Sequence, residues 1–148
     1  MNPANDTLEP SAACVALVER SEGLRLNAYW DVSGWACGYG HHGPDVQDGT
    51  VWTSEQAQAV LESDLALVGA EIKALVEVPL TQGQFDALVD FTFELGAGRL
   101  QRSSLLRLLN AGDQDGAGRQ LLAWDVVDGQ ANPGIEARRE AELVLWNS

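Results

Sequence analysis

Apolar residues recur at helical spacing along most of this 148-residue chain, most regularly between residues 53 and 76. An apolar stripe runs through that segment at intervals of three or four positions, which is typical of a helix with one buried face. Its members are Ala57, Val60, Leu61, Leu65, Val68, Ile72 and Leu75. Thr53 followed by Gln56 is a capping-box pattern that predicts where this helix begins. A long helix is therefore expected over about 53–76.

The same spacing predicts further helices on both sides of this segment. Cys14, Leu17 and Val18 repeat at helical intervals and indicate a first helix. Thr81 and Gln84 form a second capping-box pattern before another apolar face. The expected helices run from about Ser11 to Glu22, from Thr81 to Gly96, from Leu100 to Asn110, from Asp113 to Trp124 and from Ile135 to Trp146.

Between the first helix and the long helix, the pattern changes to weak alternation with many turn-forming residues. The run from Asp31 to Gly34 favours a β-hairpin turn, and turn signals between Val126 and Pro133 indicate a loop. The predicted fold class is α+β, mostly α, with one small sheet in a single domain over residues 1–148. It would consist of a loosely held arm over 1–10, a hairpin lobe over about 23–52, the connecting helix over 53–76 and a helical lobe over about 79–148.

Composition agrees with a packed globule and argues against several classes of function. The apolar share is 45%, and no run of about 18 apolar residues is present that could span a membrane. The net charge of −13 and the scattered basic residues argue against nucleic acid as a partner, because phosphate contacts need clustered Lys and Arg. The polar, acidic start is not a secretory signal peptide. Cys14 and Cys37 form no metal motif, and the cytoplasm would keep them reduced.

Glu22 and Asp31 are the candidate pair for acid–base chemistry. A carboxyl at a helix end can be partly desolvated, and desolvation raises a carboxyl pKa, whereas a carboxyl on a polar turn stays ionised. Glycoside cleavage needs two such acids, one to protonate the leaving oxygen and one to assist the water or the developing cation. On spacing alone, two unrelated surface acids among the 22 in this chain are the alternative interpretation.

Several motifs occur in an order that resembles one known family. The first are SEGLRLNAY from Ser21 to Tyr29, then Asp31, then Gly38-Tyr39-Gly40-His41. The later ones are VPLTQGQFDAL from Val78, FELGAG from Phe93, SSLL from Ser103, and NPGI from Asn132 followed by Arg138-Arg139 and Glu142. Together they resemble the phage-type lysozymes, the endolysins of the T4 lysozyme superfamily (glycoside hydrolase family 24), over about residues 14–146.

The resemblance implies roles for individual residues. It makes Glu22 the general acid, and it makes Asp31 the group that stabilises the transition state and helps to position water. It also implies a pair between His41 and Asp64 of the long helix. Such a pair would give a partner to an acid that falls on a buried stripe.

The family's third catalytic residue is a threonine, which this chain lacks at that position. Counting back from Gly-Tyr-Gly-His gives Ala36, whereas counting forward from Asp31 gives Cys37. Ala36 is the preferred assignment, because a hairpin loop absorbs a deletion more easily than a strand does. The missing hydroxyl predicts reduced activity or altered chemistry. Cys37 is expected to be a buried small apolar residue, with a thiol that replaces the threonine as the alternative.

The resemblance implies a monomeric muramidase that hydrolyses the β-1,4 bond between N-acetylmuramic acid and N-acetylglucosamine in peptidoglycan, with inversion and without a cofactor. It would stay in the host cytoplasm until a holin-type pore releases it to the periplasm and cell wall. Tyr29, Trp35 and Tyr39 are candidates for stacking on sugar rings, although each could equally pack in the core. His41 and His42 are not expected to bind a metal, because adjacent strand side chains point to opposite faces.

Two other function classes stay open. Ala36 favours a non-catalytic peptidoglycan-binding protein with a lysozyme fold, whereas Glu22 and Asp31 favour the enzyme. The charge of −13 would repel an anionic wall at long range, which predicts weak wall adhesion and better activity at raised ionic strength. An acidic decoy that binds a basic protein partner is the third interpretation.

Overall fold

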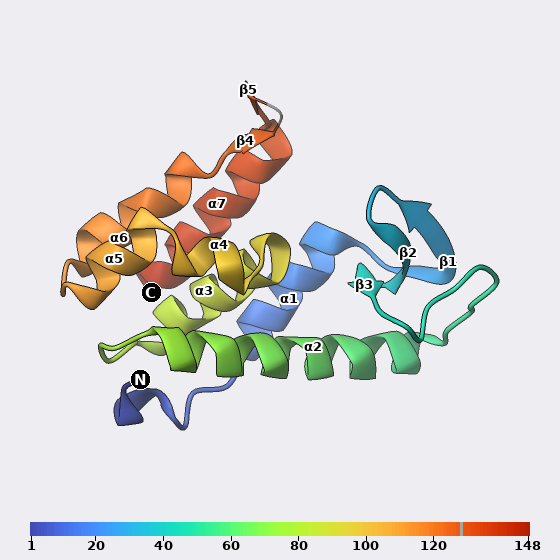
Figure 1. The fold of residues 1–148 in the computed structure, drawn as a ribbon, viewed down its shortest axis with the longest axis horizontal. Coiled ribbons are helices and arrows are strands. Elements are labelled where there is room, and N and C mark those ends of the chain that lie inside the picture. Colours follow the sequence, from blue (N-terminus) through green and yellow to red (C-terminus); the bar gives the residue numbers. More distant parts are fainter. Residues whose placement is uncertain (128) are drawn as a thin grey trace.

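The computed structural model describes residues 1–127 and 129–148 and shows an α+β fold that is mostly helical (Figure 1). Its helices are α1 (Ala12–Glu22), α2 (Ser54–Leu75), α3 (Gln82–Leu95), α4 (Ala97–Gln101), α5 (Ser104–Asn110), α6 (Gln114–Gln120) and α7 (Pro133–Trp146), with short 3-10 helices at Pro3–Asn5 and Leu121–Ala123. Its strands are β1 (Arg25–Asp31), β2 (Gly34–Gly38), β3 (His41–His42), β4 (Val126–Val127) and β5 (Gln130–Ala131).

Helix α2 runs the length of the molecule, from the small sheet to the helical region (Figure 1). The two hydrogen bonds of its capping box are present. The Gln56 N–H donates to Thr53 Oγ1 over 3.1 Å, and the Thr53 N–H donates to Gln56 Oε1 over 2.8 Å. Its buried residues are Ala57, Leu61, Leu65, Gly69 and Ile72. The expected long helix is thus present, one residue shorter at each end.

Strands β1, β2 and β3 form an antiparallel sheet in that order. A two-residue loop joins β1 to β2, and Asp31 Oδ1 accepts a hydrogen bond from the Ser33 N–H over 2.8 Å, which stabilises the turn. The register places Ala36 of β2 opposite His42 of β3. The expected hairpin turn between Asp31 and Gly34 is therefore present, and a third short strand follows it.

Helix α3 is the centre of the helical region and packs against α1, α2 and α7. Every residue from 83 to 92 is buried, so α3 has no face that is open to water. Gly69 of α2 lets Phe85 approach closely, since a Cβ at Gly69 would lie 3.1 Å from Phe85 Cζ. Because α3 is surrounded, the carboxylates of Asp86 and Asp90 are buried and need partners.

The N-terminal arm is not loosely held, contrary to the sequence-based expectation. Asn5 is fully buried; its side-chain amide donates to the Val78 carbonyl over 2.9 Å, and its side-chain oxygen accepts from the Leu80 N–H over 2.8 Å. Leu8 also packs against the core. The polar sequence of the arm does not predict this contact, because the backbone groups that Asn5 binds lie more than 70 residues away along the chain.

The helix expected from Leu100 to Asn110 is wrong in its boundaries. Helix α4 already begins at Ala97, directly after Gly96, which has a φ of 91°. The helical path then breaks before α5, because the Ser103 hydroxyl accepts a hydrogen bond from the Leu106 N–H and starts a new helix there. The sequence pattern does not distinguish a capping serine from any other polar residue, so it did not predict a helix boundary at Ser103.

The expectation of one small sheet was incomplete. Strands β4 and β5 pair antiparallel within the segment expected to be a loop. Helix α6 also ends at Gln120, and a 3-10 turn rather than α-helix occupies Leu121–Ala123. Helix α7 begins at Pro133, two residues earlier than expected, because the Asn132 side chain accepts from the Ile135 N–H and Pro is favourable at the first helical position.

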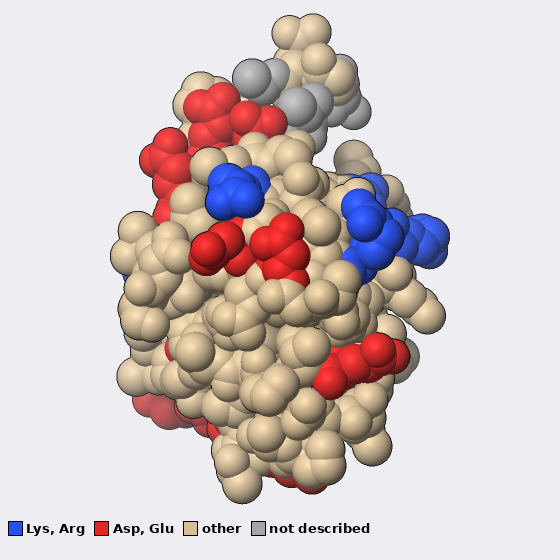
Figure 2. Space-filling model, turned by 90° about the vertical axis from the view of Figure 1, so that its left-hand side faces the viewer, with Lys and Arg blue, Asp and Glu red and all other residues tan. Residues whose placement is uncertain are grey.

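Within the described residues, no helix is long and apolar enough to cross a membrane. Figure 2 shows the end of the molecule that lies to the left in Figure 1. Lys and Arg form separate small groups on that face, and acidic residues lie between them. The described residues on this face therefore form no continuous basic surface for an anionic polymer.

His41 joins the small sheet to the long helix. Its Nδ1 lies 2.6 Å from Asp64 Oδ2 on α2, and its Nε2 lies 3.0 Å from Asp45 Oδ1. Burial opposes the charged form, but the hydrogen bonds and charges of both carboxylates outweigh it and raise the pKa of His41 above its ordinary value. The contact therefore links sheet stability to pH.

We predict that Asp64→Asn lowers stability mainly at mildly acidic pH. Because the folded-state pKa of His41 is raised, its stabilisation is fully present below the unfolded value of 6.5 and is lost as pH rises through the folded value. Thermal unfolding between pH 5 and 9 should show a loss of about 1 kcal/mol at the acid end that shrinks towards the alkaline end. Asp48→Asn, at an exposed position, makes the same charge change and should show no such trend. The same pH trend in both variants would contradict the prediction.

Candidate active site

A groove of about 470 Å³ lies between the sheet and helices α2 and α3. Its lining residues are Glu22, Gly40, His41, His42, Asp64, Leu67, Val68, Glu71, Phe93 and Glu94. One candidate acid, Glu22, thus lies in its wall. The other, Asp31, reaches the groove through His42, whose Nε2 lies 2.7 Å from Asp31 Oδ2. Glu22 therefore lines the groove directly, whereas Asp31 is connected to it through His42.

Glu22 is the last residue of α1. Gly23 follows it with a φ of 75° and ends the helix, so the Glu22 side chain projects from a fixed helix end. One of its oxygens, Oε1, accepts a hydrogen bond from Arg138 Nη1 over 3.0 Å. The side chain is 24% exposed, so the carboxyl is held from one side and open to the groove on the other.

The second Glu22 oxygen lies against Gly40. A Cβ at Gly40 would lie 3.0 Å from Glu22 Oε2, a contact tighter than most real side chains make. Gly40 also has a φ of 76°, a conformation that side chains other than glycine rarely adopt. Glycine is required here both for the turn and for the room it leaves beside the acid.

Arg138 of α7 holds Glu22 in place. Its Nε and Nη2 donate to the two oxygens of Asp90 on α3 over 2.9 Å and 2.8 Å, a bidentate geometry. Asp90 is fully buried. Burial disfavours the charged form of Arg138, but the carboxylates around it, and Asp90 above all, outweigh this and raise the pKa of Arg138 above its usual range. A permanent cation therefore connects three helices at the acid.

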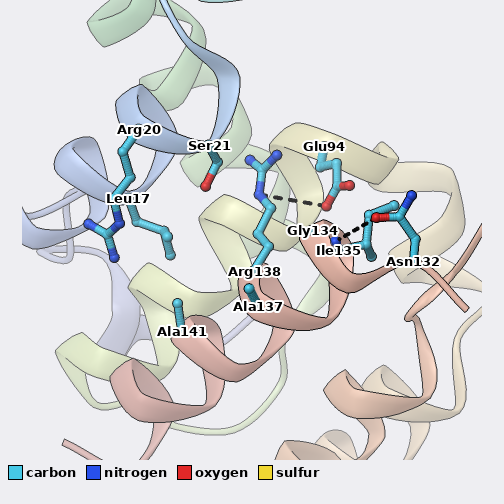
Figure 3. A pocket seen from close by; sticks show the side chains of 10 residues that line it. All are labelled: Leu17, Arg20, Ser21, Glu94, Asn132, Gly134, Ile135, Ala137, Arg138 and Ala141. Carbon is cyan, nitrogen blue, oxygen red and sulfur yellow. Dashed lines mark hydrogen bonds and ion pairs between the residues drawn. The ribbon is translucent and has the colours of Figure 1, made fainter.

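A second groove of about 470 Å³ lies on the α7 side of Arg138 (Figure 3). Arg138 and Glu94 point toward one another in this view, and Arg138 Nε lies 3.7 Å from Glu94 Oε1. Glu94 also pairs with the fully buried Arg139. Glu94 lines both grooves, so the ion network separates them.

Asp31 lies at the tip of the hairpin, and its two oxygens have different partners. The Ser33 N–H and hydroxyl both donate to Oδ1 over 2.8 Å, and His42 Nε2 lies beside Oδ2. The hydrogen bond from the Ser33 backbone, then that from its hydroxyl, are the main causes that hold the pKa of Asp31 below its ordinary value. Asp31 is therefore an ionised carboxylate at neutral pH.

Strand register separates the two candidates for the third catalytic position. Ala36 pairs with His42 and shares its face, and Asp31, opposite Gly34, lies on that same face. Cys37 points to the other face, and its Sγ lies 3.5 Å from the Leu26 carbonyl. Both residues are fully buried. The structure thus puts Ala36 beside Asp31 and turns the Cys37 thiol away from it.

The three candidate sugar-stacking residues do not line the groove. Arg25 lies over the Tyr29 ring, 4.2 Å from its centroid, and Tyr39 packs against the core. Trp35 makes an edge-to-face contact with Trp30 at 5.6 Å between ring centroids. Phe93 does line the groove, and from the sequence it is recognisable only as part of the FELGAG motif.

Sequence reasoning missed the partners of the acids. Arg138 was noted only as one of two adjacent arginines, and Asp90 and His42 received no role with Glu22 or Asp31. An ionisable residue on a helix with no polar face, such as Asp90 of α3, is the signal that could have indicated a buried ion pair. Among the described residues, no group of three or more His, Cys, Asp or Glu side chains is arranged to hold a metal ion.

Comparison with known proteins identifies the family. The family model described as phage lysozyme matches residues 19–142. This chain belongs to the phage lysozyme family. It is 41% identical over 140 residues to an endolysin of Acyrthosiphon pisum secondary endosymbiont phage 1, covering 90% of this chain and 94% of that protein.

Two solved structures share the fold of this phage lysozyme. The muramidase domain of SpmX from Asticaccaulis excentricus is 35% identical, with a TM-score of 0.88 over 95% of this chain and 99% of that one. An endolysin from the Escherichia coli phage FAHEc1 is 31% identical, with a TM-score of 0.83 over 95% of this chain and 94% of that one. The α+β, mostly α fold expected from the sequence is confirmed.

We predict that Gly40→Ala removes activity that Gly49→Ala leaves intact. Both glycines have a positive φ, 76° and 86°, so each substitution should cost roughly 1–2 kcal/mol of stability from backbone strain. Only a Cβ at position 40 would press on Glu22, because nothing lies within 4 Å of a Cβ at position 49. Unfolding free energies and rates of cell-wall solubilisation would be measured for both. Equal rates in the two variants would show that the room beside Glu22 is unimportant.

Proposed function

We propose that this phage lysozyme is an endolysin that hydrolyses the β-1,4 bond between N-acetylmuramic acid and N-acetylglucosamine in peptidoglycan. The observation that carries the proposal is the groove itself: Glu22 lines it from the end of α1, and His42, in contact with the ionised Asp31, lines it from the hairpin side. A polysaccharide chain in this groove would pass between an acid on the helical side and a carboxylate on the hairpin side. That is the arrangement glycoside cleavage requires.

In this mechanism, Glu22 is the general acid. Arg138 occupies its Oε1, which leaves Oε2, the oxygen beside Gly40, to carry the proton to the glycosidic oxygen. The bond from the anomeric carbon to that oxygen breaks as the proton arrives. Because Asp90 already balances the charge of Arg138, the role of Arg138 toward Glu22 is chiefly to orient it.

Asp31 assists on the opposite side of the sugar. Its carboxylate stabilises the positive charge that develops at the anomeric carbon, and it accepts the proton of the water that attacks there. A water between the sugar and Asp31 would give inversion of configuration, as the family resemblance implies. None of these steps uses a cofactor.

The location and partners that we propose for the enzyme are those that the family resemblance implies. Peptidoglycan is the partner, the enzyme acts as a monomer, and release from the producing cytoplasm through a holin-type pore would bring it to the periplasm and wall. The charge of −13 weakens long-range attraction to an anionic wall, so we expect activity to improve as salt screens this repulsion.

One observation favours a second candidate function, a peptidoglycan-binding protein of impaired activity. Ala36 lies beside Asp31 on the same face but offers no hydroxyl to position water. Such a protein would bind purified peptidoglycan and release no new reducing ends. The proposed enzyme would do both.

We predict that Glu22→Gln strongly reduces hydrolysis and leaves the fold intact. The amide can still accept from Arg138, but it has no acidic proton, and loss of general acid catalysis should lower the rate by about a hundredfold or more. Reducing ends released from purified peptidoglycan would be measured across ionic strengths, together with binding to the same material. Glu62→Gln, an exposed acid of α2 that does not line the groove, is the matched control and should stay active. Equal release by Glu22→Gln and the parent would refute the proposed function.

A further inference from the structure

His42 contacts the hairpin carboxylate from the position that faces Ala36. We propose that His42 is a positioning residue that takes over the task of the hydroxyl missing at Ala36, by fixing Asp31 beside the groove. This inference rests on the proposed function. It also explains how a chain without the third catalytic residue could retain activity.

The register of the sheet places His42 next to Ala36. Ala36 and His42 are directly opposite one another in the β2–β3 pair, and such cross-strand neighbours lie on one face with their Cβ atoms about 4.5–5.5 Å apart. Ala36 is also opposite Tyr29 of β1 and is fully buried. The His42 ring therefore extends from the strand next to Ala36 across the face where a longer side chain at position 36 would point.

Hydrogen bonds from His42 and Ser33 hold both oxygens of the Asp31 carboxylate. His42 Nε2 donates to Asp31 Oδ2 over 2.7 Å, while Ser33 donates twice to Oδ1. The same ring nitrogen lies 3.1 Å from Ser33 Oγ, so the three side chains form a closed triangle. A donor on each oxygen fixes the carboxylate plane. The remaining lone pairs of Asp31 are then held in one fixed direction.

His42 also lines the groove itself. Its side chain is 40% exposed and lines the groove, whereas Asp31 is not among the lining residues. His42 is thus the side chain through which Asp31 is connected to the groove. His41 cannot serve in its place, because its two ring nitrogens are occupied by Asp64 and Asp45.

An ordinary exposed ion pair would behave differently. It would add little to stability and would leave the rate of bond cleavage unchanged when removed. A residue that positions the carboxylate should instead affect kcat while KM stays the same, because binding of the sugar chain does not depend on the orientation of Asp31.

The test compares His42→Phe with His42→Gln in steady-state hydrolysis of soluble peptidoglycan fragments. Phe keeps a ring of similar size without a donor, and Gln keeps a donor without the ring. We expect His42→Phe to lower kcat by about ten- to hundredfold at a KM within twofold of the parent. His42→Gln should retain at least about a third of the parent kcat. Equal kcat for His42→Phe and the parent, or equal losses in both variants, would overturn the proposal.

A second comparison tests the link to the missing hydroxyl. In an Ala36→Thr background, His42→Phe should cost less than about threefold in kcat, because the new hydroxyl shares the task. The same loss in both backgrounds would show that His42 does not replace that hydroxyl. If the parent itself releases no reducing ends, the proposed function fails together with this inference. An active parent with an unaffected His42→Phe variant overturns only the role of His42.

Discussion

The buried pair between Arg138 and Asp90 is the constraint on which the rest of this structure depends. Helix α3 has no face open to water, so Asp90 within it requires a cation, and α7 supplies one with bidentate geometry. Removing either partner would leave an uncompensated buried charge, which typically costs about 3–5 kcal/mol. The pair therefore fixes α7 against α3. Nη1 of the same guanidinium donates to Glu22 at the end of α1. One side chain, Arg138, therefore both stabilises the helix packing and orients the candidate acid.

The two sides of the groove are built in different ways. Glu22 depends on packed helices and on the ion network of Arg138, Asp90 and Glu94. Asp31 depends on a short turn and on His42, both of which are partly exposed. The first carboxyl is thus fixed by the core, whereas the second is fixed by local hydrogen bonds. His41 connects the two sides through Asp64 of α2, so the hairpin cannot shift without disturbing the long helix.

Much of the fold could be predicted from the sequence, because repeating apolar spacing and capping boxes are local signals. Contacts between residues of the site were harder to predict from the sequence, since Arg138 lies 116 positions from Glu22 and no local pattern connects them. The pair of His41 and Asp64 came from a family resemblance rather than from periodicity. The assignment of Ala36 depended on where a deletion was placed, and strand register separates it from Cys37. The N-terminal arm was misjudged because Asn5 finds its partners far along the chain.

In the proposed mechanism, the geometry of Arg138, beyond its charge, holds Glu22 for proton transfer. The most direct measurement is the kcat of Arg138→Lys on soluble peptidoglycan fragments, with Arg107→Lys at an exposed position as the control. Lysine keeps the positive charge but cannot donate to Asp90 and Glu22 with a planar fork. We predict that kcat falls by about tenfold or more while the folded structure by circular dichroism and the KM are preserved. A kcat equal to that of the parent in a folded Arg138→Lys variant would contradict the account.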